Sequence, residues 1–268
     1  MNGRLLLLAL PLTLACAARS GRVEAPAEDR AVWDTEKGKQ AAQLDLVRAL
    51  TNGNGPDQAL SMIADLRAAG VKGPEIDVLQ ARALRRVGLL DDAEALLVKR
   101  TKSDRRYADG WMELGVLRME QREIDGAVDA FRRAIKLERD DAEAHNNLGF
   151  ALMAANRGDE AVDALRKSLE IDPSQGRTRN NLGFALLSAE RDDEAYRVFR
   201  AMSTEADARY NMGLGLELRG DADAASQQYQ TALASNPAHR SAQTRLTSLN
   251  NASSAPPGHS NPSPQERP

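Results

Sequence analysis

The sequence predicts an all-α protein, an α-solenoid of six stacked helix pairs that ends in one further helix. Two observations predict this. Aromatic residues make up only 4% of the 268 residues, and strands draw on aromatic and β-branched side chains, so helix is favoured over strand. A short motif also returns along most of the chain at a nearly constant interval of 34 residues. A period of this length is typical of stacked repeats.

The recurring motif is an aspartate, any residue, and then an alanine. Its six aspartates follow one another at intervals of 34, 34, 34, 34 and 30 residues. A second series, Leu-Gly or Met-Gly, runs in phase with the first at Gly115, Gly149, Gly183 and Gly213. The motif itself lies at Asp57 and Ala59, Asp91 and Ala93, Asp125 and Ala127, Asp159 and Ala161, Asp193 and Ala195, and Asp223 and Ala225.

These positions resemble the tetratricopeptide repeat (TPR), which has an aromatic, a Leu-Gly pair, a central alanine and a second aromatic at fixed places. The match is fullest in residues 108–141, which hold Trp111, Leu114, Gly115, Ala127 and Phe131, although Arg118 replaces a usual large apolar residue. The resemblance implies a right-handed α-solenoid of six TPR helix pairs over residues 36–250. Its units are 40–73, 74–107, 108–141, 142–175, 176–205 and 206–239, with a capping helix at 240–250.

The residue types within a unit fit two helices packed side by side. The eighth position of a unit is typically glycine or alanine, and the twentieth position is alanine. We expect these residues to be small because the paired helices approach closely there. The recurring aspartate falls in the first turn of the second helix, where we expect its carboxylate to cap free amides and to oppose the helix dipole. The fifth unit is four residues short, so its second helix should lose about one turn.

The N-terminal segment resembles that of a bacterial lipoprotein. Residues 1–15 combine a charged start with a short apolar run, which is typical of a signal peptide and too short to span a bilayer. Leu14-Ala15-Cys16 resembles the lipobox, in which the cysteine is acylated, although Thr13 stands where the family usually has leucine. An ordinary cleavage site that happens to contain Cys16 is the alternative.

Acylation of Cys16 would anchor the protein to the bacterial envelope. The residue that follows is Ala17 rather than aspartate, which by resemblance to enterobacterial sorting indicates the periplasmic face of the outer membrane. Residues 16–35 then form a tether. Residues 251–268 are rich in proline and serine and are expected to be a disordered tail.

Charge and motif searches argue against nucleic-acid binding and catalysis. The formal net charge is -3, so there is no basic excess to neutralise a phosphate backbone. His145, His239 and His259 lack acidic or cysteine partners at the spacing of metal ligands. Acidic pairs such as Asp140-Asp141 fall at helix boundaries and are better explained as caps than as catalytic carboxylates. We therefore expect no enzyme, no metal and no cofactor.

The TPR resemblance implies that the first helix of each pair lines a concave groove for peptides or extended segments of partner proteins. The sixth position of three units is an asparagine: Asn147, Asn181 and Asn211. The side-chain amides of these residues can donate and accept hydrogen bonds along a peptide backbone. The surrounding groove positions are Asn146, Asn180, Tyr210, Phe150, Phe184, Leu214, Met153 and Leu187. In the alternative interpretation, these asparagines bond neighbouring helices and the phenylalanines pack between repeats.

The same groove positions lack clustered lysine and arginine, so we do not expect recognition of a C-terminal carboxylate. The function predicted first is that of a non-catalytic scaffold, an assembly factor for a secretion or pilus system. This follows a resemblance to TPR lipoproteins of tight-adherence (Flp) pili and, less closely, to pilotins. A general adaptor in cell-wall synthesis or outer-membrane maintenance is the second prediction, and an enzyme subunit is the third.

Overall fold

The computed structural model describes residues 35–254, and within that range the chain forms thirteen helices and no strand. The predicted all-α fold is therefore confirmed. The signal peptide, Cys16, the tether up to residue 34 and the tail from residue 255 lie outside the described residues. The helices are α2 (Glu36–Asn52), α3 (Pro56–Ala68), α4 (Pro74–Arg86), α5 (Leu90–Ser103), α6 (Ala108–Glu120), α7 (Ile124–Leu137), α8 (Ala142–Ala154), α9 (Gly158–Ile171), α10 (Gly176–Ser188), α11 (Asp192–Arg200), α12 (Glu205–Arg219), α13 (Ala222–Ser235) and α14 (Arg240–Ser254).

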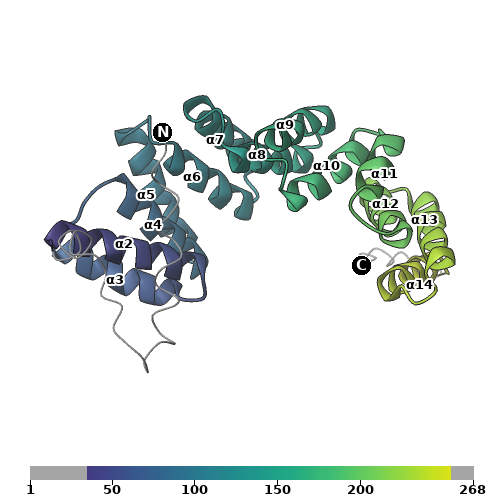
Figure 1. The fold of residues 1–268 in the computed structure, drawn as a ribbon, viewed down its shortest axis with the longest axis horizontal. Coiled ribbons are helices and arrows are strands. Elements are labelled where there is room, and N and C mark those ends of the chain that lie inside the picture. The colour runs from purple at the N-terminus through teal and green to yellow at the C-terminus, as the bar shows by residue number, and fades with distance from the viewer. Residues whose placement is uncertain (1–34, 255–268) are drawn as a thin grey trace, which may run out of the picture.

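The helices follow one another in chain order along an elongated, arched row (Figure 1). Each helix packs against the next one in the chain, and the first helix of each pair, from α2 to α12, also contacts the first helix of the following pair. Contacts therefore join only near neighbours, as in a solenoid. No helix between residues 35 and 254 is long and apolar enough to cross a membrane.

Close helix approach at the small residues is confirmed by the packing of four glycines. A Cβ built on Gly115 would lie 2.5 Å from Phe131, and one on Gly183 would lie 2.3 Å from Phe199. Gly149 and Gly213 stand in the same relation to Leu165 and Tyr229. The large side chain of each second helix thus fills the space that the glycine of the first helix leaves open. The alanines of the six Asp-x-Ala motifs are all fully buried.

The aspartates of the motif lie in the first turn of α3, α5, α7, α9, α11 and α13, as expected. Their predicted capping role is wrong. The side-chain caps found in the described chain come from other residues, Thr35, Asp141, Thr204, Asp221 and His239. Their position in the first turn still places the negative charge of the recurring aspartates at the positive end of the helix dipole.

The last two repeats depart from the regular pattern. Helix α11 has 9 residues, whereas α9 and α13 have 14, so the shortening expected from the missing residues is confirmed. Helix α14 runs to Ser254, four residues beyond its expected end.

Ion pairs with the same spacing join the second helices of the third, fourth and fifth repeats. Arg132 on α7 binds Glu160 on α9 at 2.8 Å, and Arg166 on α9 binds Glu194 on α11 at 3.0 Å. The next arginine in phase, Arg200, instead meets Glu205 at 3.0 Å, and Ala224 stands on α13 at the position that Glu160 and Glu194 hold on α9 and α11. We call this series the arginine–glutamate ladder.

Candidate partner-binding face

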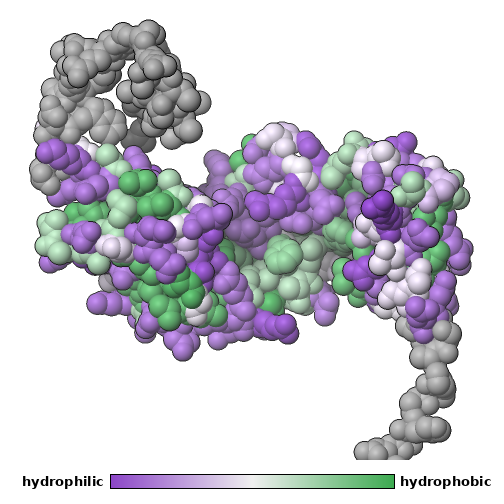
Figure 2. All heavy atoms as spheres, turned by 90° about the horizontal axis from the view of Figure 1, so that it is seen from below, coloured by the Kyte–Doolittle hydropathy of each residue, from purple (hydrophilic) through white to green (hydrophobic). Residues whose placement is uncertain are grey.

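The first helices of the pairs line two neighbouring hollows on the inner side of the arch. The first, here called the apolar groove, is formed by Phe150 and Met153 of α8, Phe184 of α10 and Leu218 of α12, and has a volume of about 480 Å³. Figure 2 looks onto this side and shows hydrophobic residues gathered near the middle of the row, with polar residues around them.

The apolar groove exposes large side chains to solvent. Phe150 is 49% exposed and Leu218 is 83% exposed. The ring of Phe184 is held in place by the buried Phe199, because the two rings pack edge to face at a centroid distance of 5.2 Å. Exposed apolar side chains in a hollow bordered by polar residues mark interaction sites. Of the predicted groove residues, Phe150, Met153 and Phe184 thus lie together on one surface.

Two predicted groove residues are instead buried, so their assignment to the surface is wrong. Leu187 is 1% exposed and packs against Gly215 of α12, where the missing side chain lets the helices close over it. Asn146 is 4% exposed. Its amide oxygen accepts hydrogen bonds from Thr178 at 3.1 Å and from Asn181 at 3.0 Å, both on α10.

The remaining asparagines do not form one continuous ladder. Asn146 donates to Asn147 at 3.1 Å and accepts from Asn181, so these three amides bond one another between α8 and α10. This is the arrangement of the alternative interpretation. Asn147 still lines a hollow, and Asn211 lines another beside Tyr210 and His239 near the C-terminal end.

Apart from the exposed Phe150 and the buried Asn146 and Leu187, the predicted groove positions are partly buried. Leu214 packs against the last core cluster, and Asn180 is half-buried.

The two histidines in the described part of the chain have partners within the fold. His145 bonds the Arg139 carbonyl, and His239 lies 3.3 Å from Asp207. Among the described residues, no group of three histidine, cysteine or acidic side chains is placed to hold a metal.

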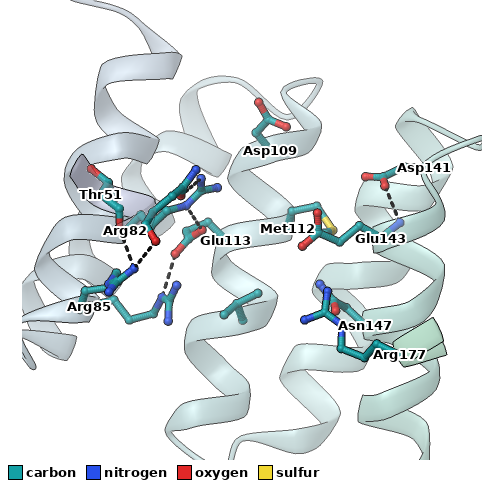
Figure 3. A pocket seen from close by; sticks show the side chains of 13 residues that line it. Thr51, Arg82, Arg85, Asp109, Met112, Glu113, Asp141, Glu143, Asn147 and Arg177 are labelled. Atoms are coloured by element: carbon teal, nitrogen blue, oxygen red, sulfur yellow. Dashed lines mark hydrogen bonds and ion pairs between the residues drawn. The ribbon is translucent and has the colours of Figure 1, made fainter. Parts of the chain in front are cut away.

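The second hollow, here called the charged cleft, was not predicted from the sequence. It has a volume of about 690 Å³ and lies between α4, α6, α8 and the start of α10 (Figure 3). One wall carries Arg82, Arg85 and Arg86, all in the last turns of α4. Their spacing in Arg-x-x-Arg-Arg places them near one another on a helix, and this was the signal in the sequence that could have revealed the cleft.

A buried carboxylate holds two of these arginines in place. Glu113 of α6 is 3% exposed, and its two oxygens accept hydrogen bonds of 2.8 Å from Arg82 Nε and Arg85 Nε. Burial acts to lower the pKa of Arg85, but Glu113 and Glu120 outweigh it and the pKa is raised above the ordinary value. The two bonds to Glu113 fix the orientation of both guanidinium groups at the wall of the cleft.

Comparison with known proteins agrees with this architecture. Residues 112–176 match the family model of the tetratricopeptide repeat. The solved structure of YrrB, described as a TPR protein with an unusual peptide-binding site, has a TM-score of 0.52 and 22% identity, over 64% of this chain and 91% of YrrB. No curated protein sequence matches this chain.

Two further solved structures share the fold. MamA has a TM-score of 0.50 and 23% identity, over 68% of this chain and 93% of its own. PilF of Pseudomonas aeruginosa has a TM-score of 0.58 and 16% identity, over 78% of this chain and 97% of its own. The chain therefore has the fold of a tetratricopeptide-repeat solenoid, with the match to the family model carried by residues 112–176.

Proposed function

We propose that this protein is a non-catalytic scaffold that binds a segment of a partner protein in the apolar groove. The observation that carries the proposal is the exposure of Phe150 on α8 and Leu218 on α12, which line the same hollow. Large apolar side chains in solvent are unfavourable until a partner covers them. YrrB, which shares the fold, is described as having a peptide-binding site, and this supports a peptide-like ligand here.

The proposal extends to location and cellular role. Acylation of Cys16 would hold the scaffold at the bacterial envelope, where it would serve as an assembly factor for a secretion or pilus system. A general adaptor of cell-wall synthesis or outer-membrane maintenance is the second candidate. Neighbouring genes for a secretin, an ATPase and a prepilin would favour the first role, and neighbouring genes for cell-wall synthesis would favour the second.

The groove is tested by removing its two exposed anchors. We expect Phe150→Ala with Leu218→Ala to weaken capture of envelope partners about tenfold, since losing about 1.4 kcal/mol of binding free energy has that effect. The measurement is quantitative mass spectrometry of proteins captured from solubilised envelopes by the full-length protein.

A matched control is the double variant Leu46→Ala with Leu89→Ala. These leucines are 50% and 49% exposed and lie outside the groove, on α2 and directly before α5. Equal loss of partners from both double variants, or no loss from either, would refute the groove. The anchor is tested separately by the intact mass of the membrane-extracted protein, because an unmodified Cys16 would contradict acylation.

A further inference from the structure

The charged cleft has the arginines of α4 on one side and the carboxylates of Asp141 and Glu143 on the other, and Asp109 and Arg177 also line it. On the α4 wall, Arg86 Nη1 donates to the carbonyl oxygens of Thr51 at 2.8 Å and Asn52 at 3.0 Å, and among the described residues it forms no ion pair with a carboxylate. Arg82 shares Glu113 with Arg85 and makes one long bond to the Asn52 side chain. This wall therefore keeps a net positive charge and unused guanidinium donors.

The opposite side of the cleft carries the carboxylates of Asp141 and Glu143 at the start of α8, and Arg177 of α10 lies on the same side (Figure 3). Asp141 accepts hydrogen bonds from the amides of Glu143 and Ala144 at the start of α8. The Glu143 side chain extends from α8 toward the middle of the cleft (Figure 3). Within residues 35–254, neither Asp141 nor Glu143 forms an ion pair.

The cleft and the apolar groove meet on α8. Asn147 lines the charged cleft, and Phe150, three residues later on the same helix, lines the apolar groove. Residues three apart on a helix are neighbours on its surface. A partner segment that crosses α8 can therefore occupy both hollows. It would pass the arginines of α4 first, then the carboxylates of α8, and then the apolar side chains of the groove.

We propose that the cleft and the groove together hold one continuous partner segment with a fixed order of side chains: acidic, then basic, then apolar. The acidic side chain lies at Arg82 and Arg86, the basic one at Glu143, and the apolar ones between Phe150 and Leu218. This inference rests on the proposed function and adds the chemistry of the partner. Charge order of this kind selects one partner and one direction of binding, because a reversed segment would place its apolar side chains at the arginines and its acidic side chain in the apolar groove.

The probe is a phage library of random 16-residue peptides, selected on the full-length protein. We expect the enriched peptides to have a basic residue between an acidic residue and an apolar cluster. The best peptide is then synthesised with both ends blocked, so that no terminal carboxylate contributes, and its affinity is measured by fluorescence polarisation.

The matched variants are Arg82→Gln with Arg86→Gln in the cleft, and Arg132→Gln with Arg166→Gln on the outer ion pairs of α7 and α9. Both remove two positive charges. We expect the cleft variant to bind the peptide about three- to tenfold more weakly and the outer variant to bind it unchanged. The cleft variant should also lose its discrimination against a peptide in which the acidic residue is replaced by its amide.

A second variant keeps the test decisive if the cleft arginines are needed for folding. Glu143 makes no side-chain bond within the described chain, so Glu143→Gln should fold normally and should weaken only peptides that carry the basic residue. Enriched peptides that are apolar but show no charge order would overturn this inference and leave the proposed function standing. The absence of any peptide selected above an unrelated bait would overturn both.

Discussion

At the scale of single residues, glycines set how closely the two helices of a pair approach. A Cβ on Gly183 would come within 2.3 Å of Phe199, and the buried ring of Phe199 has little room to move. We expect Gly183→Ala to lower the free energy of unfolding by about 1–3 kcal/mol through overpacking. Urea unfolding followed by circular dichroism measures the change.

Gly176 provides the control for that substitution. It begins α10, and an added Cβ there would meet nothing within 4 Å. Gly176→Ala should leave stability unchanged or raise it slightly, because alanine reduces the entropy of the unfolded chain. Equal destabilisation by both variants would show that the Phe199 contact is not the cause.

The asparagines provide a second residue-level prediction. Asn146 is buried and accepts bonds from Thr178 and Asn181, so Asn146→Ala leaves these donors without their acceptor and should cost about 1–3 kcal/mol. Asn211 makes no such bond to another described residue and lines an open hollow, so Asn211→Ala should cost little. Thermal denaturation of the two variants compares them directly, and similar losses would contradict the inter-repeat role of Asn146.

At the scale of elements, the junction between α11 and α12 depends on one carboxylate. Glu205 accepts a hydrogen bond of 2.6 Å from the Tyr196 hydroxyl and pairs with Arg209 and Arg200. The Tyr196 bond, followed by that of Arg209, holds the pKa of Glu205 below its ordinary value. The ionised form is therefore favoured in the folded protein more than in the unfolded chain.

Because the pKa of Glu205 is lowered in the folded state, its ionised carboxylate stabilises the fold at pH values above the unfolded pKa of about 4.3. This stabilisation is lost as the pH falls through the pKa of the folded state. We expect Glu205→Gln to be less stable than the wild type at pH 7, and the difference to shrink below about pH 4. Urea unfolding at several pH values tests this. A difference that stays constant with pH would contradict the role of the carboxylate charge.

The order and type of the elements could be predicted from the sequence because each repeat places small and large residues at fixed intervals. The sequence could not predict which side chains reach the inner surface, since this depends on contacts between neighbouring repeats. Leu187 occupies the same place in its repeat as Met153, yet it is buried because Gly215 opposes it on α12. The charged cleft was missed for a similar reason, because Glu113 and its arginines come from different repeats.

At the scale of the whole molecule, each repeat is stabilised by contacts with its neighbours, so a terminal repeat depends on the helix that covers its outer side. Helix α14 covers α13 through Ala242, Leu246 and Leu249. A chain truncated after His239 should lose hydrogen-exchange protection in α13, whose Tyr229 and Ala232 are now fully buried. Protection in α4 to α7 should not change. Loss of protection along the entire array would instead indicate a single cooperative unit.

The arginine–glutamate ladder bears on how such an array can change length during evolution. A duplicated copy of residues 142–175 placed after the fourth repeat would bring its own Glu160 and Arg166, and both would find partners at the spacing already in use. After the fifth repeat the same duplication would fail to match, because the copied Arg166 would face Ala224 on α13, where the ladder needs a glutamate. The fifth repeat thus divides the molecule into a part that can grow by whole units and a C-terminal end of fixed size.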